Sequence, residues 1–367
     1  MEHSSLSPGA IPAPGDAAQP AWEPDSTAPP SWVEDWMRET VGDRFVAPGT
    51  LQRVGAGQSN ITYRFADAAG HSWVLRRPPS GAHGTTAHDV LREARILTAL
   101  SATDIPVPTV IGTRAADERG PAFYVMDDVP GWVIETEPDA EQSAAGQRVA
   151  ISHEIIDTLT ALHAVDPDEI GLGDLGARED YVGRQIRRLT RNWDAWGRDS
   201  ASGAAWQALL GRLQDVPWPA VRPTIVHGDF RLSNMILSGG KVRAVLDWEL
   251  TALGDPLADL AWLLDDWREP GEPRIAFPTP TSIGGFAPRQ ELASRYQQRT
   301  GRDLGQLSAY QALTHWKAAT LAQGVLQRRR TGQLGRHGAM NLHDLETTIS
   351  LLLEEGLDLL ASVSRCG

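Results

Sequence analysis

The chain reads "IVHGDFRLSNMILSGGKVRAVLDWEL" from Ile225 to Leu250, and this stretch decides its fold. Two apolar runs, "NMIL" and "VRAVLD", flank the glycine-rich turn "SGGK", which predicts two short strands joined in a hairpin. Three polar side chains, Asp229, Asn234 and Asp247, stand directly beside these runs. Because charged groups near a core are costly unless they are paired or bind a cation, we expect these residues to form a site.

The predicted hairpin would bring two of these residues together. Asn234 precedes the first strand and Asp247 ends the second, so both should lie at the open end of the hairpin. An amide oxygen and a carboxylate form a hard, oxygen-only site that suits Mg²⁺ holding nucleotide phosphates. Asp229, on the loop before Asn234, can accept a proton from an attacking hydroxyl. Phosphoryl transfer needs little beyond these parts and their positioning.

The segments "HGDFRLSN" and "LDWE" resemble the catalytic region of kinase-like phosphotransferases, the group of aminoglycoside phosphotransferases and choline kinases. "HGD" stands where the related protein kinases have H-R-D, with the D-x-x-x-x-N spacing kept at Asp229 and Asn234, and "LDWE" stands in place of D-F-G. "VLRRPP", "HGDFRLSN" and "DWEL…GDPLADLA" look most like the branch whose kinase domain is fused to an acyl-CoA dehydrogenase in some animals. The resemblance implies an ATP- and Mg²⁺-dependent enzyme, monomeric or homodimeric, that phosphorylates a small-molecule hydroxyl.

The segment "GAGQSN" lies between two predicted strands, where this resemblance places the glycine-rich loop over the nucleotide phosphates. Gly55 and Gly57 permit close backbone approach, and Ser59 and Asn60 can offer hydrogen-bond donors. Asn60 replaces the last glycine of the usual G-x-G-x-x-G pattern. A plain hairpin turn is the alternative interpretation of this loop.

The third strand carries arginine where such enzymes carry lysine. "WVLR" places Arg76 at that position, and only two lysines, Lys241 and Lys317, occur among 34 basic residues. We interpret Arg76 as the phosphate-contacting cation, although arginine and lysine are not interchangeable. The resemblance implies that Glu93, in the next helix, pairs with Arg76. Alternation along the strand places Arg77 on the opposite face, and the alternative is that both arginines lie on the surface of an edge strand.

The resemblance also assigns roles to residues outside these motifs. "MDDVPG" would be the hinge whose backbone, around Asp127 and Val129, holds the adenine. Asp259, in "GDPLADLAWLL", matches an aspartate that braces the catalytic loop by hydrogen bonds, and His227 is interpreted as structural. Arg231, between the predicted base and Asn234, would offset charge on the transferred phosphoryl group.

The pattern along the chain predicts an α+β, two-lobe, protein-kinase-like fold. Apolar alternation from Leu51 onwards indicates a hairpin and a third strand, followed by a helix from Val90 to Leu100 and the strand "AFYVMDDV". Beyond Pro130 the pattern is mostly helical, and "PLADLAWLLDDW" is a further helix that begins at Pro256. We expect helices at about 140–163, 178–194, 202–214, 289–300, 305–330 and 342–363. The expected divisions are a disordered leader (1–30), a small β-sheet N-lobe (31–130) and a helical C-lobe (131–367), with the active site in the cleft between the lobes.

Composition excludes several classes of function. The net charge of −13 argues against a nucleic-acid partner, and no run of about 18 apolar residues predicts a membrane span. The N-terminal segment lacks the basic and apolar regions of a secretory signal. The one cysteine, Cys366, cannot form an intrachain disulfide. A cytoplasmic location is therefore expected.

Other functions stay open at this stage. No G-x-x-x-x-G-K-[ST] or zinc-ligand spacing occurs, and the missing A-P-E and short activation segment disfavour a protein kinase. A non-catalytic nucleotide-binding pseudokinase is the alternative from a different class. The resemblance leads us to expect as acceptor either an antibiotic, such as an aminoglycoside or macrolide, or a hydroxylated metabolite, including a hydroxyacyl thioester. Four acidic residues are interpreted as a solvated face rather than as a site for a cationic antibiotic: Asp265, Asp266, Glu354 and Glu355.

Overall fold

The computed structural model describes residues 26–55, 60–79, 89–332 and 341–363. The chain divides into two compact units, one comprising Met1–Leu91 and Ile111–Met126 and the other Arg92–Val110 and Asp127–Gly367. The division after Met126 falls close to the expected hinge. The expected leader lies outside the described residues up to residue 25.

One boundary differs from the expected lobes, because Arg92–Val110 belongs with the second unit. This segment contains most of helix α2 (Val90–Leu100). Arg92 donates a 2.5 Å hydrogen bond to the backbone oxygen of Thr251, and Arg95 donates one of 2.6 Å to that of Gly171. These bonds to distant parts of the second unit explain the grouping.

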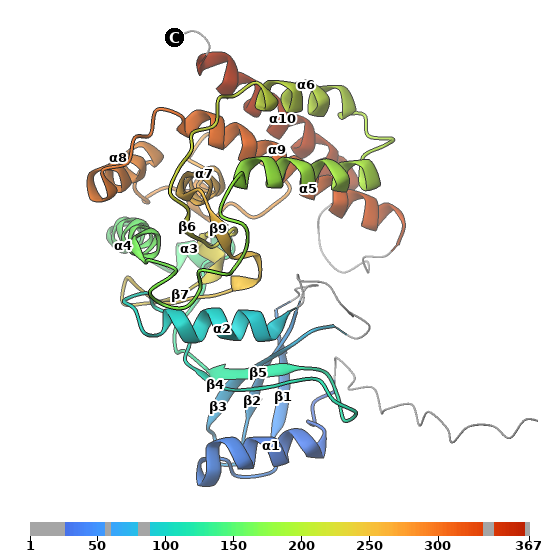
Figure 1. Cartoon of the computed structure of the whole chain (residues 1–367), viewed down its shortest axis with the longest axis vertical. Helices are drawn as coiled ribbons and strands as arrows, with labels where there is room; N and C mark the ends of the chain where they lie inside the picture. Colours follow the sequence, from blue (N-terminus) through green and yellow to red (C-terminus); the bar gives the residue numbers. More distant parts are fainter. Residues whose placement is uncertain (1–25, 56–59, 80–88, 333–340, 364–367) are drawn as a thin grey trace, which may run out of the picture. The chain divides into compact units, whose positions relative to one another are not determined.

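The first unit is built on a five-stranded sheet in the order β1-β2-β3-β5-β4 (Figure 1). Strands β1 and β3 both pair antiparallel with β2. Strand β3 lies between β2 and β5, so Arg76 and Arg77 do not lie on an edge strand, and that alternative interpretation is wrong. The strands are β1 (Thr50–Val54), β2 (Ile61–Ala66), β3 (Ser72–Arg77), β4 (Val110–Arg114) and β5 (Phe123–Asp127).

Helix α1 (Ser31–Val41) covers one face of this sheet (Figure 1). Its buried residues Val33, Met37 and Val41 recur at one helical turn, as an amphipathic helix requires. The ring of Trp36 packs edge-on against Phe123, with 4.8 Å between ring centroids. This helix was not predicted, although the spacing of its apolar residues was visible in the sequence.

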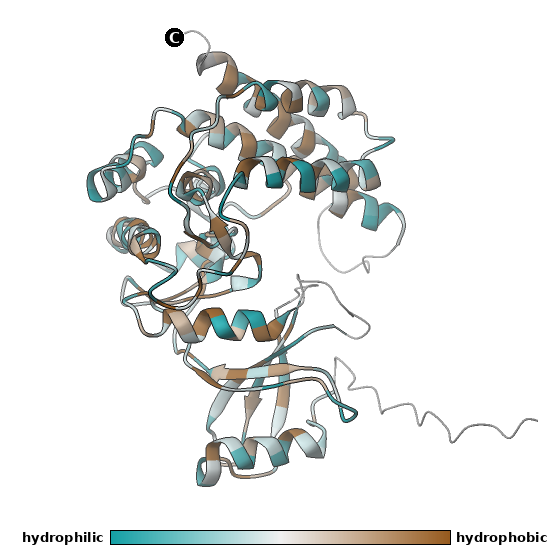
Figure 2. Ribbon diagram, in the orientation of Figure 1, coloured by the Kyte–Doolittle hydropathy of each residue, from teal (hydrophilic) through white to brown (hydrophobic). Residues whose placement is uncertain are grey.

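The second unit contains the remaining helices, and those expected from the sequence are confirmed within a few residues. In Figure 2 the ribbon of α5 and α8 is coloured as hydrophilic along most of its length, interrupted by apolar residues. In α5 those positions are buried, as amphipathic packing requires. Among the described residues, none of the helices is long and apolar enough to span a membrane. The helices are α3 (Glu137–Glu141), α4 (Ala145–Ala164), α5 (Tyr181–Trp196), α6 (Gly203–Gln214), α7 (Pro256–Asp266), α8 (Arg289–Thr300), α9 (Leu307–Arg330) and α10 (Leu342–Val363).

Helix α9 forms the centre of this unit and packs against α10, α7, α5 and α6. A row of tryptophans joins three of these helices. Trp206 of α6 stacks on Trp193 of α5 at 4.7 Å between ring centroids, and its ring packs at a tilt against Trp316 of α9 at 4.8 Å. Its indole nitrogen also donates a 2.8 Å hydrogen bond to the hydroxyl of Thr320. Helix α9 is therefore held firmly where it faces the site described below.

Strands β7 (Met235–Ser238) and β8 (Lys241–Val245) form the predicted hairpin. Gly239 and Gly240 make the two-residue turn, and both have positive φ angles, which the favoured hairpin turn requires. A second two-stranded sheet pairs β6 (Thr224–Val226) with β9 (Ala252–Gly254). The loop from β6 to β7 carries the residues predicted to react.

Candidate active site

The carboxylate of Asp229 is held by one N–H group on each oxygen. The side-chain nitrogen of Asn234 donates to Oδ2 at 2.9 Å, and the indole Nε1 of Trp262 donates to Oδ1 at 2.7 Å. Each carboxylate oxygen can accept a further hydrogen bond. Asp229 is half-buried, so its carboxylate is fixed in position and still accessible.

The backbone of this loop is braced from helix α7. The buried carboxylate of Asp259 accepts hydrogen bonds from the backbone N–H groups of His227 at 2.6 Å and Gly228 at 2.8 Å. Burial alone would raise the pKa of Asp259, but its hydrogen bonds from His163 and from the backbone N–H of Gly228 hold that pKa below the usual value. The bracing role expected for Asp259 is confirmed.

Glycine is required at position 228. Its φ angle is +84°, and a Cβ atom there would lie 2.8 Å from the backbone oxygen of Leu250. A side chain would therefore meet both backbone strain and a steric clash.

His227 connects the Asp229 loop to the end of strand β8. Its Nδ1 accepts a 3.2 Å hydrogen bond from the backbone N–H of Asp229, and its Nε2 donates to the backbone oxygen of Leu246 at 2.8 Å. A backbone N–H only donates and a carbonyl only accepts, so these partners assign the neutral Nε2–H tautomer. The ring is fully buried, which confirms a structural role for His227.

The hairpin places Asn234 and Asp247 at its open end, as the sequence predicted. The backbone N–H of Leu246 donates to the backbone oxygen of Asn234 at 2.8 Å, which extends the β7–β8 pairing by one step. Asp247 follows in the left-handed conformation, with φ of 64°. Strained backbone of this kind is often found at functional sites.

The side chain of Asn234 fits the expected metal site. Its Nδ2 donates both to the backbone oxygen and to Oδ2 of Asp229, each at 2.9 Å. This orientation leaves Oδ1, the ligand atom that Mg²⁺ prefers, directed away from Asp229. Among the described residues no cluster of three or more His, Cys, Asp or Glu is able to hold a metal. A site at Asn234 and Asp247 therefore depends on further oxygen ligands from phosphates or water.

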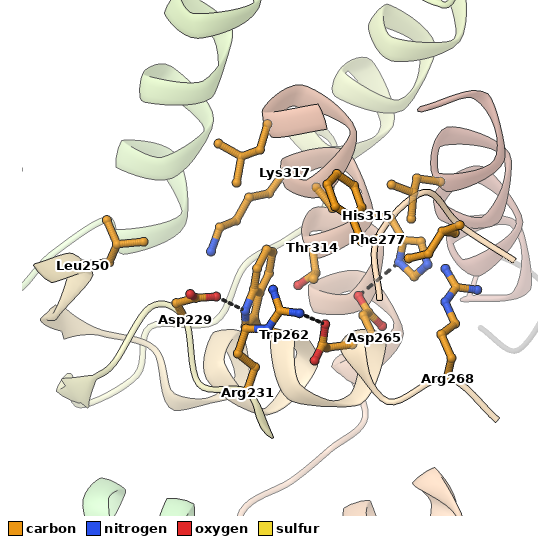
Figure 3. A pocket seen from close by; sticks show the side chains of 15 residues that line it. Asp229, Arg231, Leu250, Trp262, Asp265, Arg268, Phe277, Thr314, His315 and Lys317 are labelled. Carbon is orange, nitrogen blue, oxygen red and sulfur yellow. Dashed lines mark hydrogen bonds and ion pairs between the residues drawn. The ribbon is translucent and has the colours of Figure 1, made fainter. Parts of the chain in front are cut away.

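A cavity of about 270 Å³ opens beside Asp229 within the second unit (Figure 3). Apolar side chains from η4 (Trp248–Leu250), α9, α10 and the segment after α7 form much of its wall. Polar and charged side chains from the β6–β7 loop, α7, the segment directly after it and α9 form the rest. Its lining residues are Asp229, Arg231, Leu250, Trp262, Asp265, Asp266, Arg268, Ile275, Phe277, Thr314, His315, Lys317, Ala318, Leu321 and Leu352.

Arg231 points into this cavity and forms a 2.8 Å ion pair with Asp266. Burial opposes the charge on Arg231, but Asp266, Asp229 and Glu135 outweigh it and raise the pKa of the guanidinium. Burial also raises the pKa of Asp266, although Arg231 opposes that shift. Arg231 thus lines the cavity beside Asp229, and its proposed interaction with the phosphoryl group stays a prediction.

His315 lies at the centre of a second charged group in the cavity wall. Its Nδ1 lies 2.9 Å from the backbone oxygen of Gln311 and 3.1 Å from Asp265, and its Nε2 lies 3.0 Å from Glu355. All these partners are acceptors, so both ring nitrogens carry hydrogens. Burial opposes this charge, but Asp265 and Glu355 raise the pKa of His315 to about 10.

The solvated face expected for four acidic residues is found at only one of them. Glu354 is exposed. Asp265 and Asp266 line the cavity in ion pairs, and Glu355 accepts two 2.8 Å hydrogen bonds from Arg268. The expectation failed because "LLDDW" and "LEEG" contribute to the contact between helices α7, α9 and α10, which the local pattern does not reveal.

Two residues at the site were not predicted from the sequence, Trp262 and Lys317. Trp262 follows Asp259 by three positions on α7, so both side chains lie on one face of that helix. Lys317 is one of only two lysines in an arginine-rich chain. Both features were visible in the sequence, but neither shows that the side chain lies close to Asp229 in the fold.

The predicted phosphate loop is only partly described. Gly57 and Ser59 lie outside the described residues, whereas Gly55 has a φ angle of +75°, which suits glycine. Asn60 is 6% exposed, and its side-chain amide has no hydrogen-bond partner among the described residues. A buried amide of this kind is suited to a ligand that supplies the missing partner.

The remaining nucleotide-binding candidates belong to different units. Arg76 is half-buried on β3, with Arg77 buried on the opposite face, where it donates to the hydroxyl of Tyr63. Glu93 is 2% exposed on α2, and a carboxylate is rarely buried to this degree unless it is paired. Its pairing with Arg76 stays a prediction.

The expected hinge residues follow the sheet of the first unit. Asp127 ends β5, and its backbone N–H donates to the backbone oxygen of Thr109 at 2.9 Å. Val129 lies two residues further on and is half-buried. Both residues directly follow the boundary between the two units, where adenine binding by their backbone is expected.

Known proteins are similar to this chain in sequence and in fold. Acyl-CoA dehydrogenase family member 10 of Mus musculus is 32% identical over 321 residues, which cover 83% of this chain. The match spans 29% of the length of that relative. An acyl-CoA dehydrogenase family member 11 of Rattus norvegicus is also 32% identical, over 84% of this chain and 40% of its own length. The resemblance to the fused branch is therefore confirmed.

Solved structures show the same two-part fold. A Ralstonia eutropha protein assigned to the aminoglycoside phosphotransferases is 29% identical, with a TM-score of 0.75 over 90% of this chain and 98% of that one. A thermostable mutant of aminoglycoside phosphotransferase APH(4)-Ia, in complex with AMP-PNP and hygromycin B, is 18% identical, with a TM-score of 0.59 over 88% and 98% of the two chains. The second likeness confirms the kinase-like α+β fold.

The model of the phosphotransferase enzyme family matches residues 50–326, which include every described catalytic candidate. The matched region runs from the first strand of the sheet to the cavity-lining part of α9. The chain belongs to the phosphotransferase enzyme family.

Proposed function

We propose that this chain binds ATP with Mg²⁺ and transfers the γ-phosphoryl group to a hydroxyl group of a small molecule. The observation that carries the proposal is the carboxylate of Asp229, which is fixed by Trp262 and Asn234 and lines the cavity. A base in such a position is able to reach a hydroxyl group of a molecule that occupies the cavity. Family membership supports the class of enzyme, a small-molecule phosphotransferase.

Asp229 would act as the general base. It accepts the proton of the acceptor hydroxyl while the hydroxyl oxygen forms a bond to the γ-phosphorus, and the bond to the leaving ADP breaks. Trp262 and Asn234 keep the carboxylate oriented throughout, so little reorganisation is needed. Alignment and charge neutralisation supply most of the rate in this kind of reaction.

Asn234 and Asp247 would hold Mg²⁺, and Gly55, Asn60 and Arg76 would contact the nucleotide phosphates. Bound Mg²⁺ neutralises phosphate charge and orients the triphosphate. The orientation of Asn234, whose Nδ2 rather than Oδ1 faces Asp229, and the buried amide of Asn60 support this assignment. A mutant in the same fold binds AMP-PNP, and the cytoplasmic location expected for an ATP-dependent enzyme is part of the same proposal.

The cavity favours an acceptor with an apolar part over a polycationic aminoglycoside. Asp265 and Asp266 already pair with His315 and Arg231, so their charge is not available to a cationic ligand. Lys317 adds a positive charge to the same wall. Among the acceptors considered, a hydroxylated metabolite therefore suits the cavity best. The apolar wall comprises Leu250, Ile275, Phe277, Ala318, Leu321 and Leu352.

The first test measures nucleotide binding and turnover separately. Thermal stabilisation by ATP is recorded with and without Mg²⁺, and ADP release is then followed with aminoglycosides, macrolides, hydroxylated fatty acids and hydroxyacyl thioesters. We expect Mg²⁺-dependent stabilisation, and acceptor-dependent ADP release with one of the hydroxylated metabolites. Stabilisation without turnover of any acceptor would instead support the non-catalytic binding module.

A substitution at the proposed base completes the test. Asp229→Ala should lower kcat by about 10²–10⁴, the usual contribution of a positioned base, and leave ATP binding intact. Asp199→Ala is the matched control, because Asp199 is exposed and lies outside the cavity. Turnover by Asp229→Ala at the rate of the control would remove Asp229 from the role of base.

A further inference from the structure

The cavity beside Asp229 contains one cation that differs from the others. Arg231 pairs with Asp266, Arg268 with Glu355, and His315 with both Asp265 and Glu355. Within the described part of the chain, Lys317 is the one cation of the cavity wall that has no carboxylate within ion-pair distance.

The position of Lys317 is nevertheless well defined. Its Nζ donates a 2.8 Å hydrogen bond to the backbone oxygen of Gly228, the residue before Asp229. It also lies 3.7 Å from the centroid of the Trp262 ring, in a cation–π contact. The same indole ring donates to the carboxylate of Asp229. Figure 3 shows the ammonium group of Lys317 directed towards Asp229 across the cavity.

An ammonium group has three hydrogens to donate, and the described contacts of Lys317 use one of them in a hydrogen bond. Lys317 is partly buried and has no described carboxylate within ion-pair distance, so its charge is stabilised further when an anion approaches. Burial lowers the pKa of Lys317 to about 8, and Arg188 of α5 lowers it too, while Asp229 and Asp259 oppose the shift. Lys317 is therefore still mostly protonated near pH 7.

The anion that would approach is defined by the reaction. A general base must lie about 2.6–3.2 Å from the hydroxyl whose proton it accepts, and that hydroxyl oxygen bonds to the transferred phosphorus. The phosphoryl group therefore passes close to Asp229, on the side that faces the cavity. Preorganised donors aimed at developing charge are usually the largest source of rate in such sites.

We propose that Lys317 is a catalytic residue whose ammonium group contacts the transferred phosphoryl group, an inference that rests on the proposed phosphotransferase function. Arg231, closer in sequence to Asp229, is held by Asp266, whereas Lys317 retains free hydrogens. A compact ammonium group also fits between the Gly228 carbonyl and the Trp262 ring, where a planar guanidinium needs more room.

The test uses a transition-state analogue and needs no known acceptor. Binding of Mg²⁺·ADP and of Mg²⁺·ADP with aluminium fluoride is measured by calorimetry for wild type, Lys317→Met and Lys317→Arg. Lys317→Met keeps most of the side-chain length and removes the charge. Lys241→Met is the matched control, because Lys241 is the only other lysine, is exposed and pairs with Glu154 on the surface.

We expect Lys317→Met to bind Mg²⁺·ADP within twofold of wild type, but to lose at least tenfold of the additional affinity that aluminium fluoride gives. Lys317→Arg should recover part of that affinity, and Lys241→Met should equal wild type. If aluminium fluoride increased the affinity for Mg²⁺·ADP equally in wild type and Lys317→Met, the proposed role of Lys317 would be overturned. An equal loss of affinity for Mg²⁺·ADP with and without aluminium fluoride would also overturn it, because such a loss indicates a structural role. Failure of wild type to bind Mg²⁺·ADP would instead contradict the proposed function itself.

Discussion

The indole Nε1 of Trp262 donates a 2.7 Å hydrogen bond to Oδ1 of Asp229. One helical turn earlier on α7, the carboxylate of Asp259 accepts hydrogen bonds from the backbone N–H groups of His227 and Gly228. Helix α7 therefore fixes both the backbone of the β6–β7 loop and the carboxylate of Asp229 that this loop carries. Lys317, on α9, contacts the same loop and the same indole ring.

Replacing Trp262 by phenylalanine should lower kcat about tenfold with little change in ATP affinity. The substitution removes a hydrogen bond to a carboxylate, which contributes roughly 1.5–3 kcal/mol, and each 1.4 kcal/mol corresponds to a tenfold change in rate. Steady-state kinetics of ADP release measure the effect. Trp218→Phe is the control, since its indole nitrogen donates to the backbone oxygen of Leu213, away from the cavity. Equal kcat values for the two variants would show that orientation of Asp229 does not limit the reaction.

Asp247→Asn should abolish the dependence of nucleotide binding on Mg²⁺ and leave the fold intact. Asparagine tolerates the left-handed conformation of Asp247, whereas alanine would add backbone strain there. The substitution removes the negative charge that we propose holds the metal. Calorimetric titration with ATP, with and without Mg²⁺, gives the result. A wild-type response to Mg²⁺ in this variant would contradict the metal-binding role.

The parts of this site that the sequence predicted are those set by local geometry. The Gly239–Gly240 turn fixes the hairpin, and the hairpin fixes the positions of Asn234 and Asp247. Asp229 and Asn234 lie on one short loop, so their hydrogen bond follows from the chain path.

The parts that were missed come from packing between distant helices. Lys317 reaches Gly228 from 89 residues away along the chain, and Arg268 reaches Glu355 from 87 residues away. No local period of apolar residues encodes these distances. Helix α1 was missed for a different reason, since the spacing of Val33, Met37 and Val41 was visible but was not used.

Arg76→Lys should retain much of the activity, whereas Arg76→Ala should lose most of it. If Arg76 contacts phosphate, a lysine on the same strand still supplies a positive charge, although without the planar fork of arginine. Nucleotide affinity and kcat of both variants are compared with those of Arg53→Ala, an exposed position on the edge strand β1. Identical values for the lysine and alanine variants would remove Arg76 from the nucleotide site.

The His315 group in the cavity wall predicts how stability depends on pH. Asp265 and Glu355 raise the pKa of His315 from 6.5 to about 10 despite its burial. Because the pKa of His315 is higher in the folded than in the unfolded protein, its proton stabilises the fold fully when the pH is below the unfolded-state pKa of about 6.5. This contribution is lost as the pH rises from about 6.5 towards 10. Stability should therefore decline across that range, by at most about 1.4 kcal/mol per pH unit for one proton.

The pKa of Glu355 is shifted in the opposite direction, and this shift makes stability depend on pH in acid. Burial would raise the pKa of Glu355, but hydrogen bonds from His315 and Arg268 lower it from 4.5 to about 2. Its contribution is present above pH 4.5 and is lost as the pH falls towards 2.

Urea unfolding of wild type and His315→Gln between about pH 5.5 and 9 isolates the contribution of the histidine. The glutamine variant lacks the titrating proton, so its free energy of unfolding should change less with pH. His153→Gln, at a half-buried histidine outside the cavity, is the control. Parallel profiles for wild type and His315→Gln would show that His315 carries no additional proton in the folded state.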